Sequence, residues 1–426
     1  MWNNTTKAIS ERAMSALKYL RLSNFKSFAE AEITFSPFSL LIGANASGKS
    51  NVRDAIRLLH GISRGYSLDE AMNGKRQGGV RVWTGIRGGS AEICRHGQSQ
   101  LSLSAGIGEY SYSISIEFVG NARVPKLVDE SLNGPDGRLF RLKTSSSTPK
   151  GHVEVVLVVD GKHGGQIIPM PRTQSALGQI PSMLDDKGGK DDNAATILRG
   201  VNCLGDVLGG VRFSQFSPAA MRKAATPGET QLGRQGENLS TALKEICKSE
   251  KHRDRIASWL RRLTPMDVGG FEFAMDKSGR VELSLLERNG NRSSVESVSD
   301  GMLRFLAILV AMGSPDTGQT FFLEEVESGI DPSRLNDLMD ILLAQTDRNR
   351  ATVIATTHSP LLLRVLGRRR LQQAHLAYRF KGSTDSQLIC LEDVPGIRDK
   401  LERYDLGVLH ESDWFRKTLG QAAEDA

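Results

Sequence analysis

The stretch that decides the fold is Gly43-Ala44-Asn45-Ala46-Ser47-Gly48-Lys49-Ser50, which fits the phosphate-binding pattern G-x-x-x-x-G-K-[ST]. A compact apolar run precedes it over 38–42, and apolar residues on a helical period follow it over 51–59. The sequence therefore predicts a strand, a loop and a helix, with Gly61 ending the helix.

This loop has the chemistry of a site for the phosphates of ATP. Its glycines let the backbone turn N–H groups toward phosphate oxygens, and the start of the helix adds the positive end of its dipole. Lys49 supplies a point charge for the outer phosphates, and the Ser50 hydroxyl can ligate Mg²⁺. The residues that we expect to contact the nucleotide here are Gly43, Asn45, Gly48, Lys49, Ser50 and Asn51.

Two glutamates follow another apolar run, 320–323, which predicts a buried strand ending in carboxylates. Adjacent residues of a strand point in opposite directions, so Glu324 and Glu325 cannot perform the same task. We assign Glu324 to the Mg²⁺ shell, and Glu325 to positioning the attacking water as general base. By itself the pattern equally fits a strand that ends in two acids at a solvent edge.

A histidine follows a third apolar strand, expected over 351–355. His358 would then lie at the carboxyl end of a parallel strand, where open α/β sheets bind ligands. There it can form a hydrogen bond to a γ-phosphate or to the attacking water, which makes Lys49, Glu325 and His358 the expected catalytic set. The alternative is an ordinary capping or loop histidine.

The segment Val298-Ser299-Asp300-Gly301-Met302-Leu303-Arg304 precedes an apolar helix expected over 302–312. Ser299 or Asp300 can cap this helix, and Gly301 leaves room for the close approach of a phosphate. Alone, the string indicates no more than a helix N-cap.

Together these segments resemble an ABC-type ATPase head. They occur in the expected order, as the strings at 24–28 (Asn-Phe-Lys-Ser-Phe), 43–51, 299–306, 323–332 and 356–362. The chain resembles the RecF/SMC-related AAA-type ATPases, the branch that includes the ATPase part of the overcoming-lysogenization-defect nucleases. The resemblance implies an α/β fold: an ABC-type P-loop head with an antiparallel β meander in its first lobe and a helical insertion subdomain.

The resemblance also implies an ATP sandwich. In such heads the signature motif of one protomer, here Ser299, Gly301 and Arg304, closes over ATP held by the P-loop of another, and Asp331 contacts the opposed site. Two residues depart from the usual pattern: Glu324 stands where most ABC ATPases have aspartate, and Val326 replaces a proline. The Q-loop glutamine cannot be placed, since Gln77, Gln98 and the turn at 87–89 are equal candidates.

We expect one head, 14–426, built from both ends of the chain. Its parts are an N-terminal lobe with P-loop and β meander (14–175), a helical basic insertion (176–280), a lobe with the signature, acidic strand and switch histidine (281–380), and a C-terminal extension (381–426). Alternating apolar and polar residues, as in 110–118 and 152–159, predict the strands of the meander.

Composition narrows the class of protein. With 426 residues, 39% of them hydrophobic and 24% charged, the chain can bury a sizeable core. No apolar run approaches the ~20 residues that cross a bilayer, and the N-terminus lacks a signal peptide, so we expect no membrane association and a cytoplasmic location. The four cysteines are scattered, which predicts reduced thiols without a zinc site.

The charge pattern leaves DNA open as a partner. The net charge is +6, and segment 215–265 holds ten Lys and Arg residues against five Asp and Glu residues, which makes it a candidate binding face. A second cluster, Arg364 and 368–370, reads more simply as the solvated end of a helix.

The leading functional hypothesis is an ATPase that forms homodimers or higher homo-oligomers and controls a separately encoded effector, a nuclease, in bacterial anti-phage defence. No Asp-x-Asp pair of a TOPRIM nuclease follows His358, and no long coiled coil interrupts the chain. Two alternatives remain open: a RecF-like DNA-binding repair or recombination ATPase, and a scaffold or inhibitor whose nucleotide locks the shape of an effector.

Overall fold

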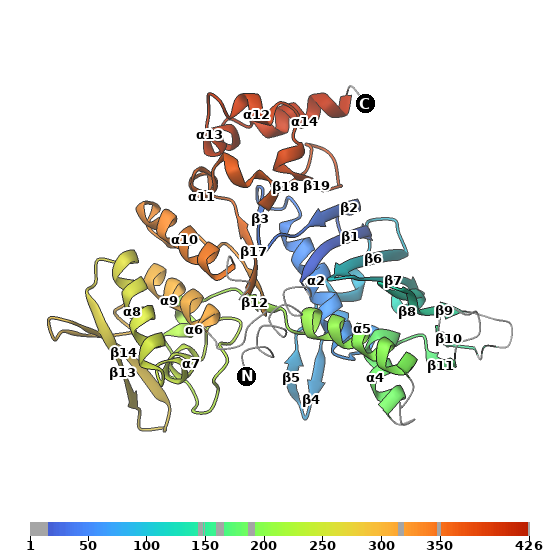
Figure 1. The fold of residues 1–426 in the computed structure, drawn as a ribbon, viewed down its shortest axis with the longest axis horizontal. Coiled ribbons are helices and arrows are strands. Elements are labelled where there is room, and N and C mark those ends of the chain that lie inside the picture. The colour runs from blue at the N-terminus through green and yellow to red at the C-terminus, as the bar shows by residue number, and fades with distance from the viewer. Residues whose placement is uncertain are drawn as a thin grey trace.

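The computed structural model describes residues 16–143, 148, 150–158, 166–185, 192–313, 319–346 and 351–424. Two large sheets lie on either side of the helix that follows the P-loop, α2 (Lys49–Ser63) (Figure 1). This confirms the expected ABC-type α/β head.

The first sheet has eight strands in the order β11-β10-β9-β8-β7-β6-β1-β2, and all its neighbours are antiparallel. Its strands are β1 (Leu17–Phe25), β2 (Phe28–Thr34), β6 (Gln100–Ile107), β7 (Tyr110–Val119), β8 (Val124–Gly134), β9 (Gly137–Lys143), β10 (His152–Leu157) and β11 (Ile167–Pro171). Buried and less buried residues alternate along β7, as one covered sheet face requires. The expected meander is therefore present, although it starts from the N-terminal hairpin β1-β2.

The second sheet has six strands in the order β12-β16-β17-β3-β18-β19. Its strands are β3 (Phe38–Ile42), β12 (Arg212–Ser214), β16 (Gln319–Leu323), β17 (Ala351–Thr357), β18 (Ala374–Tyr378) and β19 (Gln387–Cys390). All are parallel except β19, which pairs antiparallel with β18 at one edge. Every residue of β3 is buried, because helices or the other sheet cover both faces.

Helix α2 is buried from Val52 to Ile62 and packs between the two sheets. The expectation that Gly61 ends this helix is wrong. A Cβ at Gly61 would lie 3.1 Å from Ala71 Cβ, so the missing side chain allows α3 (Leu68–Asn73) to pack closely against α2.

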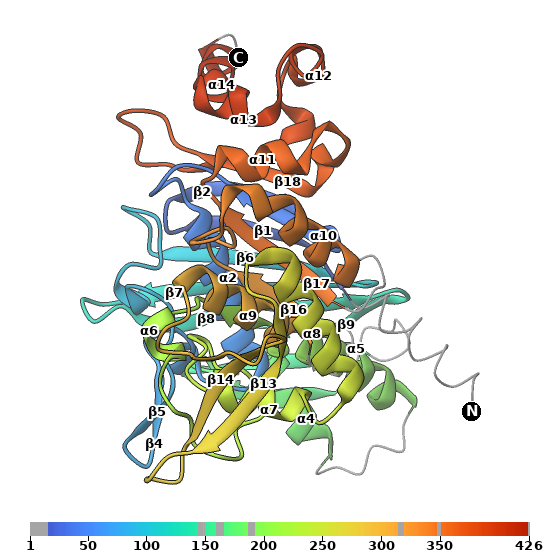
Figure 2. The same cartoon turned by 90° about the vertical axis from the view of Figure 1, so that its left-hand side faces the viewer.

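Apolar helices cover the opposite face of the parallel sheet, and Figure 2 shows α8, α9 and α10 on that side. The helices of this second core are α6 (Pro218–Met221), α7 (Leu239–Ile246), α8 (Glu250–Leu263), α9 (Asp300–Met312), α10 (Leu335–Thr346), α11 (Pro360–Leu366), α12 (Ile397–Lys400), α13 (Leu406–Glu411) and α14 (Trp414–Glu424). Further short elements are β4 (Lys75–Gln77), β5 (Val80–Trp83) and the 3₁₀ helices η1 (Gly89–Ala91), η2 (Pro332–Arg334), η3 (Arg368–Gln373) and η4 (Leu391–Asp393).

The segment expected as one helical insertion, 176–280, is divided between the two cores. Helices α4 (Ala176–Asp185) and α5 (Asp192–Gly209) pack with α2 and the antiparallel sheet, whereas α7 and α8 pack with α9. Strand β12 lies between these groups and extends the parallel sheet. The strand that ends the segment, β13 (Val268–Met275), forms a separate antiparallel sheet with β14 (Val281–Glu287) and β15 (Arg292–Ser294).

Within the described part of the chain, no helix combines the length and the apolarity that a membrane span requires.

Candidate nucleotide site

The P-loop joins the end of β3 to the start of α2, as the sequence predicts. Gly43 has φ +150°, and a Cβ there would lie 2.2 Å from the carbonyl oxygen of Ala377 on β18. Gly48 has φ +114°, and its Cβ would lie 2.9 Å from Phe28 Cζ. Both glycines are therefore required by the backbone conformation and by the close approach of neighbouring strands.

Lys49 bends back over this loop, because its Nζ donates hydrogen bonds to the carbonyl oxygens of Gly43 and Ala44. Burial lowers the pKa of Lys49, and the negative charges of Glu325 and Glu327 act in the opposite direction. The lysine thus lies within electrostatic reach of the acidic end of β16, which brings the P-loop and the carboxylates into one site.

The two glutamates after β16 have different environments. Glu324 forms an ion pair with Arg53 of α2, and 15% of its side chain is exposed. Glu325 is exposed and has φ +47°, a strained conformation for a residue with a side chain. Its backbone N–H donates to Thr356 Oγ1 at 3.0 Å, so β17 fixes the position of this turn.

A third acid, Glu327, is part of the site and was not singled out from the sequence. Its Oε1 accepts hydrogen bonds from Thr357 Oγ1 at 2.6 Å and from the backbone N–H of His358 at 3.2 Å. The imidazole Nδ1 of His358 lies 3.8 Å from the same oxygen. The sequence at 324–327, Glu-Glu-Val-Glu, includes this residue, but a strand pattern alone does not show which of the three acids is buried.

A buried charge network connects the acidic strand end with the N-terminal hairpin. Asp54, the residue after Arg53, is fully buried and accepts hydrogen bonds from Lys26 at 2.8 Å, Arg53 at 2.9 Å and Arg87 at 3.0 Å. Burial alone would raise the pKa of Asp54, but these cations outweigh it and lower that pKa. Among the Q-loop candidates, the turn at Arg87 is thus the one whose contacts reach α2.

The hairpin β1-β2 also contacts the start of α2 directly. Ser27 Oγ accepts a hydrogen bond from Asn51 Nδ2 at 2.7 Å and donates one to Ser386 Oγ at 2.7 Å. A polar pocket of about 420 Å³ opens beside Lys26, Ser27, Asn51 and Arg95. The residue string at 24–28 therefore lies next to the P-loop helix, on the side of Asn51.

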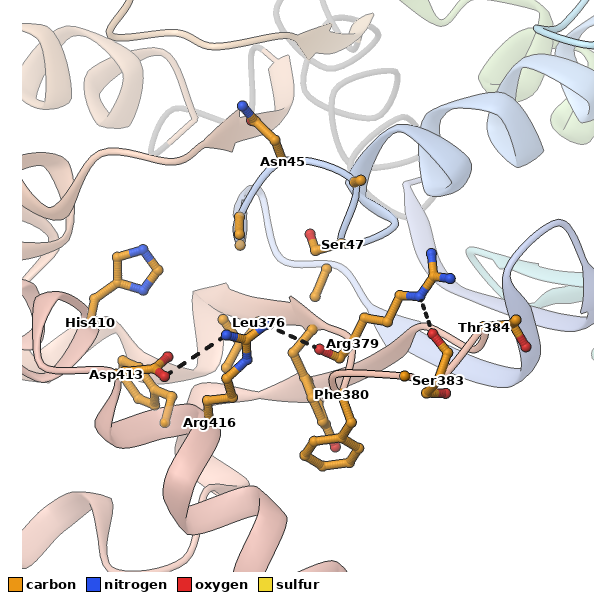
Figure 3. Close-up of a pocket in the computed structure, with 17 residues that line it drawn as sticks. Asn45, Ser47, Leu376, Arg379, Phe380, Ser383, Thr384, His410, Asp413 and Arg416 are labelled. Carbon is orange, nitrogen blue, oxygen red and sulfur yellow. Dashed lines mark hydrogen bonds and ion pairs between the residues drawn. The ribbon is translucent and has the colours of Figure 1, made fainter.

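A larger cavity of about 510 Å³ lies on the other side of the P-loop, against the C-terminal helices. Figure 3 shows Asn45 and Ser47 on one side of it and His410 and Arg416 on the other. The Ser47 hydroxyl is buried and has no hydrogen-bond partner among the described residues. Burial lowers the pKa of His410, and the charges of Lys49 and His358 lower it further, so the extension 381–426 brings an imidazole near the phosphate loop.

The signature residues lie at a second location in the same chain. Ser299 caps α9, with its Oγ accepting from Met302 N–H at 3.4 Å. A Cβ at Gly301 would lie 1.7 Å from the carbonyl oxygen of Gly329, so only glycine fits between α9 and the turn after β16. A pocket of about 400 Å³ is lined by Ser299, Gly301 and Asp331, and no P-loop residue lines it.

Two residues of the expected trans contacts are held by neighbours within the chain. Arg304 Nη1 donates to Ser328 Oγ at 2.8 Å. Asp331 caps η2 and accepts from the backbone N–H and the hydroxyl of Ser333, which lower the pKa of this carboxyl. Their roles toward an opposed nucleotide therefore stay predictions.

The candidate DNA-binding face over 215–265 carries several arginines that already have partners. Arg222 pairs with Asp300 at 2.7 Å and Arg262 pairs with Asp337 at 2.6 Å. In the second basic cluster, Arg364 pairs with Glu411 at 2.9 Å, in keeping with a solvated helix end. These contacts stabilise helix packing and weaken the case for a phosphate-binding surface.

The donor set fits ATP and Mg²⁺. The first turn of α2 leaves backbone N–H groups free of helical partners for phosphate oxygens. Hydroxyl and carboxylate oxygens, which Mg²⁺ prefers, come from Ser50 and Glu324, and Glu327 Oε2 is a buried acceptor without a partner among the described residues. The described residues contain no cluster of three or more His, Cys, Asp or Glu side chains that could hold a metal ion without a nucleotide. No disulfide joins the four cysteines, all of which lie in the described part of the chain.

Two family models match the chain. Residues 16–87 match "AAA ATPase domain", and residues 194–364 match "AAA domain, putative AbiEii toxin, Type IV TA system". No curated protein matches.

Solved structures of SMC heads are similar over most of their length. The SmcHead bound to the C-winged helix domain of ScpA is 15% identical, with 88% of this chain and 97% of that chain covered and a TM-score of 0.45. The SMC head domain from Thermotoga maritima is 16% identical, with 88% and 98% covered and a TM-score of 0.37. The Smc head with an extended coiled coil bound to the C-terminal domain of ScpA, derived from Pyrococcus furiosus, is 14% identical, with 91% and 100% covered and a TM-score of 0.45.

The two family matches contain the P-loop, the signature helix, the acidic strand and the switch histidine, in the order in which the structure assembles them. The chain is therefore an ATPase with AAA ATPase domains over 16–87 and 194–364, and it converts ATP to ADP and phosphate.

Proposed function

We propose that this ATPase works as an ATP sandwich between two copies of the chain and that its nucleotide state controls a separately encoded effector. The observation that carries the catalytic part is the meeting of Lys49, Glu325, Glu327 and His358 at the carboxyl ends of β3, β16 and β17. Ligands of open parallel sheets bind at this edge.

Each residue at this edge has a distinct task in the proposal. Lys49 exchanges its contacts with Gly43 and Ala44 for the outer phosphates, which compensate its buried charge. Ser50 and Glu324 hold Mg²⁺, which neutralises charge that develops on the β- and γ-phosphates. Glu325 is exposed at the tip of the strand, where it orients the attacking water and accepts its proton.

The sandwich is supported by the separation of the two half-sites. Ser299 and Gly301 line a pocket with Asp331 but not with the P-loop of their own chain. A second copy related by two-fold symmetry would supply the same pocket to the nucleotide of the first.

The effector is proposed to be a nuclease in a cytoplasmic bacterial defence system. The family description that names an AbiEii toxin and a type IV toxin–antitoxin system supports the defence context, while the nuclease is what the resemblance to this branch of ATPases implies. Arg222 and Arg262, two of the ten basic residues in 215–265, are engaged by acids of the same chain, which weakens the alternative of a DNA-binding ATPase.

Two experiments test these parts separately. Lys49→Ala should abolish tight ATP binding and turnover, whereas the exposed Lys400→Ala should leave both unchanged. Equal ATP affinity of the Lys49→Ala variant and the wild type would contradict the site. For the effector, the product of the neighbouring gene is co-purified and its nuclease activity is measured with ATP, with ADP and with Glu325→Gln. Equal nuclease activity with ATP, with ADP and with Glu325→Gln would contradict control by this ATPase.

A further inference from the structure

Glu327 carries a buried carboxylate of which one oxygen is held and the other is not. Its side chain is 8% exposed. Oε1 has two donors, Thr357 Oγ1 and the backbone N–H of His358, while Oε2 is buried and accepts no hydrogen bond from any described residue. Proteins rarely bury an acceptor without a partner, and at an active site such an atom indicates a contact made during function.

The held oxygen fixes the orientation of the carboxylate. The Thr357 hydroxyl accepts from the backbone N–H of Ser359 at 2.9 Å, so its proton is directed to Glu327. Both donors to Oε1 belong to residues at the end of β17, directly at the switch histidine. The carboxylate is therefore held by the same segment that carries His358.

The imidazole of His358 is a donor beside this carboxylate that is able to move. Its Nδ1 is 3.8 Å from Glu327 Oε1, beyond a hydrogen bond, and half of the side chain is exposed, so the ring has room to turn. Lys49 is also influenced by the charge of Glu327, but its Nζ donates to the carbonyl oxygens of Gly43 and Ala44. We expect rotation of the ring to bring Nδ1–H to Oε2, the oxygen that has no partner among the described residues.

We propose that Glu327 is a positioning residue for His358: its carboxylate accepts a hydrogen bond from Nδ1–H, fixes the imidazole tautomer and leaves Nε2 as an acceptor for a proton of the attacking water. This inference rests on the proposed ATP site. A carboxylate behind an imidazole orients the ring and selects its tautomer in other catalytic sites, so the chemistry requires no additional group.

Glu325 does not perform this task. It is exposed at the strand tip and has φ +47°, and the contact that fixes its backbone goes to Thr356 rather than to the histidine. The two acids therefore have separate functions: Glu325 acts on water, and Glu327 acts on His358.

The tautomer is measured directly in the full chain without nucleotide. The imidazoles are labelled with ¹⁵N, and His358→Asn identifies the signals of that ring in a long-range ¹H–¹⁵N correlation spectrum. In the wild type we expect His358 to carry its proton on Nδ1. In Glu327→Gln the amide keeps an oxygen for Thr357 but places an N–H₂ group where Oε2 lies, and the proton should move to Nε2.

The matched control is Glu325→Gln, which removes the same charge two positions earlier and should leave the His358 tautomer unchanged. Glu327→Gln should also lower kcat about tenfold or more while the affinity for a fluorescent ATP analogue changes less than about threefold, since a positioning residue acts on turnover. Identical His358 signals in the wild type and Glu327→Gln would overturn the proposal.

A second variant provides an independent test if Glu327→Gln does not fold. Thr357→Val removes one of the two donors to Oε1 and should produce a mixture of His358 tautomers; an unchanged wild-type spectrum would again overturn the proposal. The spectra are recorded without ATP, so the tautomer result does not depend on dimer formation. Failure of the wild type to form an ATP sandwich would contradict the proposed function but would not affect the test of Glu327.

Discussion

Arg53, one helical turn beyond the P-loop serine, donates a hydrogen bond from its guanidinium to Oε1 of Glu324 at the end of β16. The Arg53 side chain is 5% exposed and that of Glu324 15% exposed, so the pair is largely shielded from solvent. The carboxylate assigned to Mg²⁺ is thus paired with an arginine of the P-loop helix.

Replacing Arg53 by Met should destabilise the fold, because it leaves Glu324 unpaired and removes one of three cations around Asp54. Breaking a buried pair by removing one partner costs about 3–5 kcal/mol. The control is Arg21→Met, which breaks the exposed pair with Glu32 and should leave the free energy of unfolding nearly unchanged. Urea denaturation of both variants checks the difference; equal losses would show that the Arg53 pair is not effectively buried.

The stability of the chain should fall between neutral and mildly acidic pH because of two buried histidines. Burial lowers the pKa of His60 and of His375 from 6.5 to about 4. The unfolded chain therefore binds protons that the folded chain excludes, and stability is complete above 6.5 and is lost as the pH falls toward 4. Each histidine should cost about 2 kcal/mol at pH 5.

His375→Leu isolates this effect, since other buried groups such as Glu130 act equally in both proteins. The free energy of unfolding is measured at about pH 7.5 and about pH 5 in urea. The variant should lose less stability on acidification than the wild type. The same loss in both would mean that His375 is protonated in the folded chain or does not titrate in this range.

The P-loop glycine at the end of β3 should not tolerate a methyl group. In Gly43→Ala the Cβ would lie 2.2 Å from Ala377 O, so the loop or β18 must move and ATP binding should be lost. Gly97→Ala is the matched control, because that glycine also has positive φ but has no neighbouring atom within 4 Å. Isothermal titration with ATP compares the two; unchanged affinity in Gly43→Ala would show that the loop geometry is not required.

The parts of the site that follow from local pattern could be predicted from the sequence. The P-loop, the strand before Glu324 and the strand before His358 each depend on a short run of residues whose periodicity and end chemistry agree. Ser299 was placed correctly as a candidate cap for the same reason, because capping involves residues only three apart.

The parts that depend on pairing between distant segments could not be predicted. The Arg53–Glu324 pair joins residues 271 positions apart, and no periodicity links them. In strand β13 two glycines follow Val268 and weaken the strand pattern, and strand β12 has only three residues. For these reasons the sequence places both strands within the expected helical insertion. Glu327 was missed because its burial is decided by the fold of β17, not by its own neighbours in sequence.

The measurement that tests the central claim most directly is sedimentation velocity of Glu325→Gln with ATP and Mg²⁺. This change removes the general base but keeps the P-loop, so we expect ATP to be bound and turnover to fall by about two orders of magnitude or more. With ATP the protein should sediment as a dimer or larger homo-oligomer, and this assembly should dissociate when ATP is replaced by ADP. A variant that binds ATP and remains a monomer, or that hydrolyses ATP as fast as the wild type, would contradict the ATP sandwich.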